Sequence, residues 1–210
     1  MAFRNPRFQA AYSLEPRTWC VNCHAPLESQ ATVNRLPTKA TLEGVNCAAC
    51  HIHQGQIVAS RFSIYTIPGI EYFLKDGHAT GVDSSLREAE FCASCHQFNF
   101  PAGHAPLHYS STVMQDTYGE FREQTSDSLL SGLTASCQGC HFPAGSHSLP
   151  GPLQQDWMRR RIRIEFRQET ETETGLAMVV ARFRIPRIGH AFPTGDLFRT
   201  VRLAAYARGA

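Results

Sequence analysis

The 210-residue sequence has no long hydrophobic run, little charge and almost no lysine. No uninterrupted apolar stretch approaches the about 20 residues that a transmembrane helix needs. Charged residues make up only 18% of the chain and the net charge is +2. This balance argues against an intrinsically disordered chain and against a strongly basic protein that binds nucleic acid. We therefore expect an ordered globular protein. The abundant residues indicate its class.

Cysteine and histidine are those residues, and all eight cysteines follow one repeated pattern. Two cysteines separated by two residues are followed directly by a histidine in four places: Cys20, Cys23 and His24; Cys47, Cys50 and His51; Cys92, Cys95 and His96; Cys137, Cys140 and His141. This CxxCH pattern is the attachment signature of c-type haem. Two thiols about one helical turn apart can each bond a porphyrin vinyl group, and the histidine then reaches the iron as its proximal ligand.

Two other kinds of site are compatible with the cysteines alone. Four CxxC pairs would also suit two Cys₄ zinc sites or four disulfides. Neither kind of site needs a histidine after each pair, and the chain has only 10 histidines in 210 residues. A histidine after all four pairs by chance is on the order of 1 in 10⁵. The sequence therefore predicts four covalently bound haem c groups.

The chain resembles the multihaem c-type cytochromes, which carry several CxxCH motifs and mostly bis-histidine haems. Besides the motifs, the resemblance rests on three stretches: 92–100 (CASCHQFNF), 114–121 (MQDTYGEF) and 189–195 (GHAFPTG). It implies electron transfer, and it implies a periplasmic or extracellular location because haem is attached outside the cytoplasm. The first six residues contain no hydrophobic signal region, so we expect a mature or recombinant form whose targeting segment has been removed or replaced.

Six further histidines are available for the distal face of the four irons. We predict His78, His104, His147 and His190 as distal ligands, since each lies in a segment rich in glycine or proline. His190 is the strongest of the four, because it is far from any CxxCH motif and the related proteins carry a ligand histidine in this stretch. The fourth ligand, His104, has open alternatives in His108, His53, Met114 or a residue of another chain.

The organisation changes near residue 155. Residues 1–155 are predicted to be a tetrahaem domain of loops and short helices packed on haem, with helices starting near Asp83 and Ser126. Residues 156–210 alternate apolar and polar side chains in three stretches, 162–166, 179–185 and 201–205, which predicts antiparallel strands. We therefore expect an α+β fold with much irregular structure. Three strands make an incomplete sheet, so we expect a truncated chain or a sheet completed by another chain.

The function predicted from these features is electron relay through closely packed haems, between redox protein partners or along an assembly. The alternative is a haem reductase with one open iron, or a module that passes electrons into a larger multihaem enzyme. Six spare histidines are enough to fill all four distal positions, so we expect an electron carrier rather than an enzyme. A homo-oligomer or filament would follow if a neighbouring subunit supplied the fourth ligand. Nucleic-acid partners and a transmembrane segment are not expected.

Overall fold

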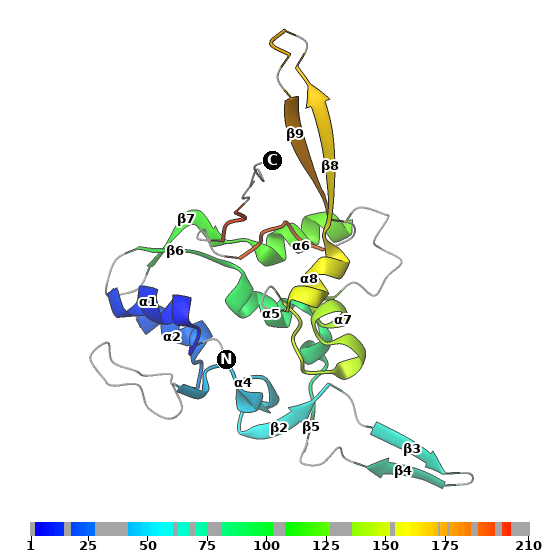
Figure 1. Cartoon of the computed structure of the whole chain (residues 1–210). Coiled ribbons are helices and arrows are strands. Elements are labelled where there is room, and N and C mark those ends of the chain that lie inside the picture. The colour runs from blue at the N-terminus through cyan, green and yellow to red at the C-terminus, as the bar shows by residue number, and fades with distance from the viewer. Residues whose placement is uncertain are drawn as a thin grey trace. The chain divides into compact units, whose positions relative to one another are not determined.

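A computed structural model provides the structure of the chain, which consists of two compact units, Met1–Phe91 and Cys92–Ala210. The structure describes residues 3–14, 18–27, 42–60, 63–67, 70–74, 81–102, 108–126, 136–151, 154–171, 173–175, 177–185, 189–195 and 199–202. Short helices alternate with small sheets and irregular segments in both units (Figure 1). The predicted α+β class with much irregular structure is confirmed.

The first unit contains three short α-helices, one 3₁₀-helix and two small sheets within the described residues. Its helices are α1 (Pro6–Leu14), α2 (Thr18–His24), α4 (Cys47–His51) and η1 (Ser84–Arg87), and its strands are β1 (Ile52–His53), β2 (Gln56–Ala59), β3 (Ser63–Ile67), β4 (Ile70–Leu74) and β5 (Gly81–Val82). In one sheet β2 pairs antiparallel with β1 and parallel with β5, and in the other β3 pairs antiparallel with β4. The first sheet joins the end of the second CxxCH helix to the segment before the third.

A small aromatic cluster forms the core of the first unit. Phe3, Val21 and Ala25 are buried, and Phe8 and Tyr12 of α1 pack against them. The three aromatic rings have centroids 5.5–5.6 Å apart, a spacing at which aromatic pairs attract beyond the effect of burial. The cluster therefore holds α1 against α2, the helix that carries the first CxxCH motif.

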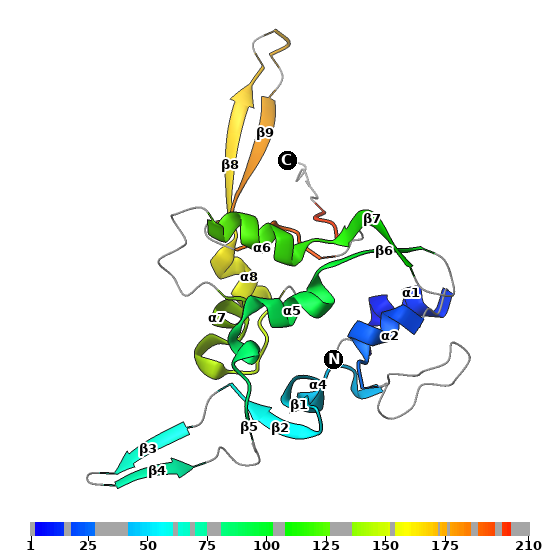
Figure 2. The same cartoon turned by 180° about the vertical axis from the view of Figure 1, so that it is seen from behind.

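The second unit is built from helices and two long antiparallel pairs of strands. The boundary between the units falls within α5 (Ala89–His96), which is followed by β6 (Phe98–Ala102), β7 (His108–Gln115), α6 (Thr117–Ser126), α7 (Cys137–His141), η2 (Pro143–Gly145), α8 (Gln155–Arg161), β8 (Arg163–Thr170) and β9 (Ala177–Arg184). β6 pairs with β7, and β8 pairs with β9. In Figures 1 and 2, the orange-red segment 189–195 passes alongside α6.

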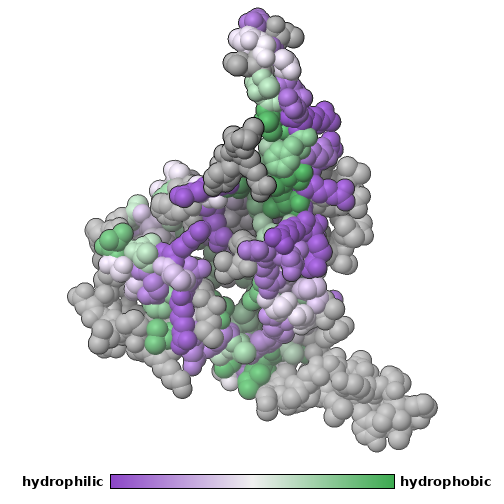
Figure 3. All heavy atoms as spheres, viewed as in Figure 1, coloured by the Kyte–Doolittle hydropathy of each residue, from purple (hydrophilic) through white to green (hydrophobic). Residues whose placement is uncertain are grey.

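The hairpin of β8 and β9 has one apolar face and one charged face. Because strand side chains alternate between faces, the pairs Ile164–Phe183 and Phe166–Ala181 share one face, while Glu165–Arg182 lies on the other. Phe166 and Val179 on the apolar face are 70% and 73% exposed, whereas Ala181 and Phe183 are half-buried, so the outer part of this face is exposed (Figure 3). The hairpin projects from α8 and is the most exposed sheet of the second unit.

The strand and helix predictions had mixed outcomes. The first two strands predicted after residue 156 are confirmed as β8 and β9, whereas Val201 and Arg202 lie outside any strand and residues 203–205 are outside the described residues. Asp83 does begin helical structure, as the N-cap of η1. Ser126 is the last residue of α6, and the residues after it, where the second helix start is predicted, lie outside the described residues. The division at residue 155 stays a prediction. Within the described residues, no helix is long and apolar enough to cross a membrane.

Candidate functional site

Each of the four CxxCH motifs lies on a short helix that ends at the histidine of the motif. The helices are α2, α4, α5 and α7. Positions three and four residues apart share one face of a helix, so both sulfurs and the imidazole are on the same side. The side chains of Asn46 and Ser136 cap α4 and α7 by accepting main-chain N–H bonds. A polar residue directly before the first cysteine therefore starts the helix at two of the motifs.

The cysteines are not joined to one another. All eight fall within the described residues, none of them is in a disulfide bond, and all are of intermediate or full exposure. Among the described residues, no three histidine, cysteine, aspartate or glutamate side chains converge closely enough to hold a metal ion by themselves. The disulfide alternative is thus absent from the structure, and the thiols are spaced as thioether anchors require.

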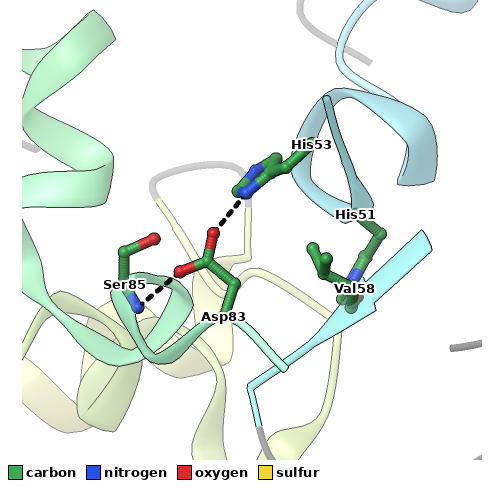
Figure 4. Close-up of polar contacts among 5 residues, drawn as sticks. All are labelled: His51, His53, Val58, Asp83 and Ser85. Atoms are coloured by element: carbon green, nitrogen blue, oxygen red, sulfur yellow. Dashed lines mark hydrogen bonds and ion pairs between the residues drawn. The ribbon is translucent and has the colours of Figure 1, made fainter. Parts of the chain in front are cut away.

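The proximal histidines make specific contacts through Nδ1. His51 donates from Nδ1 to the carbonyl oxygen of Val58 (2.8 Å, Figure 4), and His141 donates to that of Pro150 (3.0 Å). These bonds place the proton on Nδ1 and make Nε2 the nitrogen that can coordinate a metal. At the third motif the side-chain amide Nε2 of Gln115 donates to Nδ1 of His96 at 2.8 Å.

The first motif is positioned by ring stacking. The imidazole of His24 lies against the ring of Phe8, with centroids 3.7 Å apart and planes inclined by 12°. Phe8 belongs to the aromatic cluster of α1, so this cluster also fixes the orientation of the His24 ring.

The fourth motif shows the clearest relation between a predicted proximal and a predicted distal ligand. The rings of His141 and His190 are nearly parallel, inclined by 13°, and their centroids are 6.3 Å apart. Two imidazoles on opposite sides of one metal have centroids about 6 Å apart, because each nitrogen lies about 2 Å from the metal. The pair therefore fits the spacing of the two axial ligands of a haem.

Hydrogen bonds at Nδ1 orient both rings of this pair, and burial affects the protonation of His141. His190 donates from Nδ1 to the carbonyl oxygen of Ala191 (2.9 Å), as His141 does to Pro150. Burial lowers the pKa of His141, and the nearby His190 and Arg161 lower it further, although the bond to Pro150 acts in the opposite direction. The lowered pKa of His141 favours the neutral imidazole, which is the form that binds iron.

The loop that carries His190 is held by helix α6. The Glu120 carboxylate accepts a bond from the main-chain N–H of Ala191 (3.1 Å) and another from the Thr194 hydroxyl (2.6 Å). Thr117 bonds to the same hydroxyl at 2.9 Å. A Cβ at Gly189 would lie 2.8 Å from the ring of Phe121, so only glycine allows this approach. The loop is therefore fixed on both sides of His190.

The other predicted distal ligands are less well placed or lie outside the described residues. His78 and His104 fall outside them. His147 is exposed and its ring lies edge-on to that of Phe142, with centroids 5.5 Å apart. Of the alternatives for the fourth ligand, His108 is exposed on β7 and Met114 is half-buried on the same strand.

The contacts that Glu120 and Asp83 make with predicted ligand segments were not predicted from the sequence. Glu120 lies in a stretch that supported the resemblance, but no local pattern links it to a loop more than 70 residues away. His53 was an open alternative, but its partner Asp83 is 30 residues away. The sequence predicted Asp83 only as the start of a helix. Contacts between distant segments are needed to find both groups.

Comparison with known proteins agrees with the haem-binding interpretation over part of the chain. The family model described as cytochrome c554 and c-prime matches residues 5–52, which include the first two CxxCH motifs. This match covers less than a quarter of the chain and supports a c-type cytochrome that carries covalent haem and transfers electrons. No curated protein and no solved structure matches the chain.

Proposed function

We propose that this protein is a tetrahaem c-type cytochrome that relays electrons through closely spaced bis-histidine haems. The observation that carries the proposal is the His141–His190 pair, whose ring spacing of 6.3 Å suits two axial ligands of one iron. The three other CxxCH helices have the same arrangement of thiols and histidine. An iron with both axial positions filled by histidine is suited to electron transfer rather than to binding a substrate.

The residues of the chain have distinct tasks in this proposal. The eight cysteines anchor four haems, and His24, His51, His96 and His141 are the proximal ligands. His190 is the distal ligand opposite His141, and His78 and His147 are proposed for two of the other haems. Bound haem c would supply a one-electron couple between ferric and ferrous iron. The chain sets the reduction potentials through ligand orientation, hydrogen bonds at Nδ1 and the degree of burial.

The proposed partners and location follow from this role. Other redox proteins would donate and accept the electrons, and attachment of the haems requires a periplasmic or extracellular location. The exposed apolar face of the β8–β9 hairpin is compatible with contact to another protein chain. Assembly into an oligomer or filament belongs to the same proposal as a further arrangement of the haem chain.

The number and coordination of the haems test the proposal directly. We expect the intact protein, produced with haem-attachment machinery, to carry four haems by mass spectrometry and by its pyridine haemochrome spectrum. All four irons should be low-spin in the electron paramagnetic resonance (EPR) spectrum, and the reduced protein should bind no carbon monoxide. Fewer than four haems would contradict the tetrahaem assignment. A stoichiometric carbon monoxide shift at one haem would instead favour a reductase with an open iron.

The role of Glu120 gives a second prediction. We expect Glu120→Ala to loosen the loop at His190, because it removes the acceptor of two bonds worth about 1.5–3 kcal/mol each when one partner is charged. The melting temperature should fall, and a fraction of one haem should become high-spin. Glu120→Gln keeps an acceptor oxygen and should lie between Glu120→Ala and the native protein.

The matched control lies one helical turn away. Glu123 is exposed on the same helix, so Glu123→Ala should change neither the spin state nor the melting temperature by a comparable amount. Equal spectra for Glu120→Ala and the native protein would show that α6 does not position His190.

A further inference from the structure

The strongest feature outside the site described above is the pair formed by His53 and Asp83. His53 lies in β1, two residues after the proximal ligand His51. The turn after it, Gln54–Gly55, has positive φ at both residues (50° and 78°) and brings β2 back alongside β1. His51 and His53 consequently have different partners: His51 bonds to Val58, whereas His53 points to Asp83 (Figure 4).

Asp83 is held firmly in place by its own neighbours. One carboxylate oxygen accepts the main-chain N–H of Ser85 at 2.9 Å and caps η1, and the other contacts Nδ1 of His53. The main-chain N–H of Asp83 donates to the carbonyl oxygen of Ala59 (2.9 Å). The bonds from Ser85 and then His53 lower the pKa of Asp83. These contacts fix the orientation of the carboxylate toward His53.

The His53 imidazole is hydrogen-bonded through Nδ1, as the proposed iron ligands are. In His51, His141 and His190 an oxygen atom accepts the Nδ1 proton and leaves Nε2 for a metal. In His53 the acceptor is a carboxylate, which makes the imidazole a more basic ligand than a carbonyl does. The side chains of His53 and Asp83 are 27% and 30% exposed, so both are partly buried.

We propose that His53 is the distal ligand of a haem other than the one bound by its own motif, and that Asp83 is its positioning residue. This inference rests on the proposed function, and it assigns to His53 the place predicted for His104. His51 and His53 are two residues apart and face different partners. His53 therefore cannot reach the far side of the porphyrin that His51 would hold. A carboxylate at Nδ1 strengthens electron donation to the iron and favours its ferric form.

The experiment uses the holoprotein with all four motifs intact. We expect His53→Ala to convert one of four low-spin irons to high-spin and to allow one equivalent of carbon monoxide to bind after reduction. His53→Met should keep that iron low-spin but raise its potential, because a thioether ligand favours the ferrous form. Asp83→Asn should leave four low-spin irons and raise the potential of one. A merely structural ion pair would move none of these signals.

Three comparisons make the result decisive. Gln56→Ala, at the exposed position paired with His53 across the two strands, is the control and should leave the EPR spectrum unchanged. Four low-spin irons in a His53→Ala protein that carries all its haems would overturn the proposal. It would also be overturned if His104→Ala or His108→Ala, and not His53→Ala, converted one iron from low-spin to high-spin. The haem count of the native protein is measured separately, so a count below four would refute the proposed function and not this ligand assignment.

Discussion

Replacing His190 with alanine is expected to turn one of the four irons from low-spin to high-spin. The ring of His190 lies parallel to that of His141 at the spacing of an axial pair, and the loop around it is fixed by Glu120 and Phe121. Without its imidazole, this loop offers the iron proposed at His141 no ligand of its own. Haem attachment should be retained, since both thioether anchors and His141 are unchanged.

The measurement is an EPR spectrum of the oxidised protein with a carbon monoxide titration of the reduced protein. One high-spin signal and one equivalent of bound carbon monoxide are expected. His190→Met should restore the low-spin state at a higher potential, because a thioether replaces the imidazole. A spectrum of His190→Ala identical to that of the native protein would rule out His190 as a ligand.

Preventing haem attachment is expected to leave the chain without a cooperative fold. Among the described residues, buried hydrophobic side chains are confined to the first unit: Phe3, Val21, Ala25, Val58 and Ala89. In the described part of the second unit, Pro150 is the only buried residue. A domain normally buries well over half of its unfolded surface, so another group has to supply the missing apolar contacts. Four porphyrin rings would do so.

The test is a variant in which all eight cysteines are replaced by serine. We expect its far-UV circular dichroism to resemble that of an unfolded chain and its thermal scan to show no cooperative transition. The holoprotein, measured in parallel, should melt cooperatively. A sharp transition in the serine variant would mean that the protein part forms its own core.

The local features of the structure were predictable, and the long-range contacts were not. The CxxCH helices, the β8–β9 hairpin and the cap at Asp83 each follow from residues close together in the chain. The pairing of Glu120 with Ala191, or of His53 with Asp83, depends on how loops return to distant helices.

The β8–β9 hairpin also offers a practical point of attachment. Its described tip, residues 173–175, is exposed and separated from α8 by eight paired residues on each strand, a distance of about 25 Å. Exposed loop tips tolerate insertions, so a peptide tag placed there would orient the protein on a surface. A tag at the N-terminus would instead lie near α1, whose Phe8 supports the His24 ring. Immobilisation through the hairpin thus leaves α7, the CxxCH helix that lies wholly within the second unit, undisturbed for voltammetry.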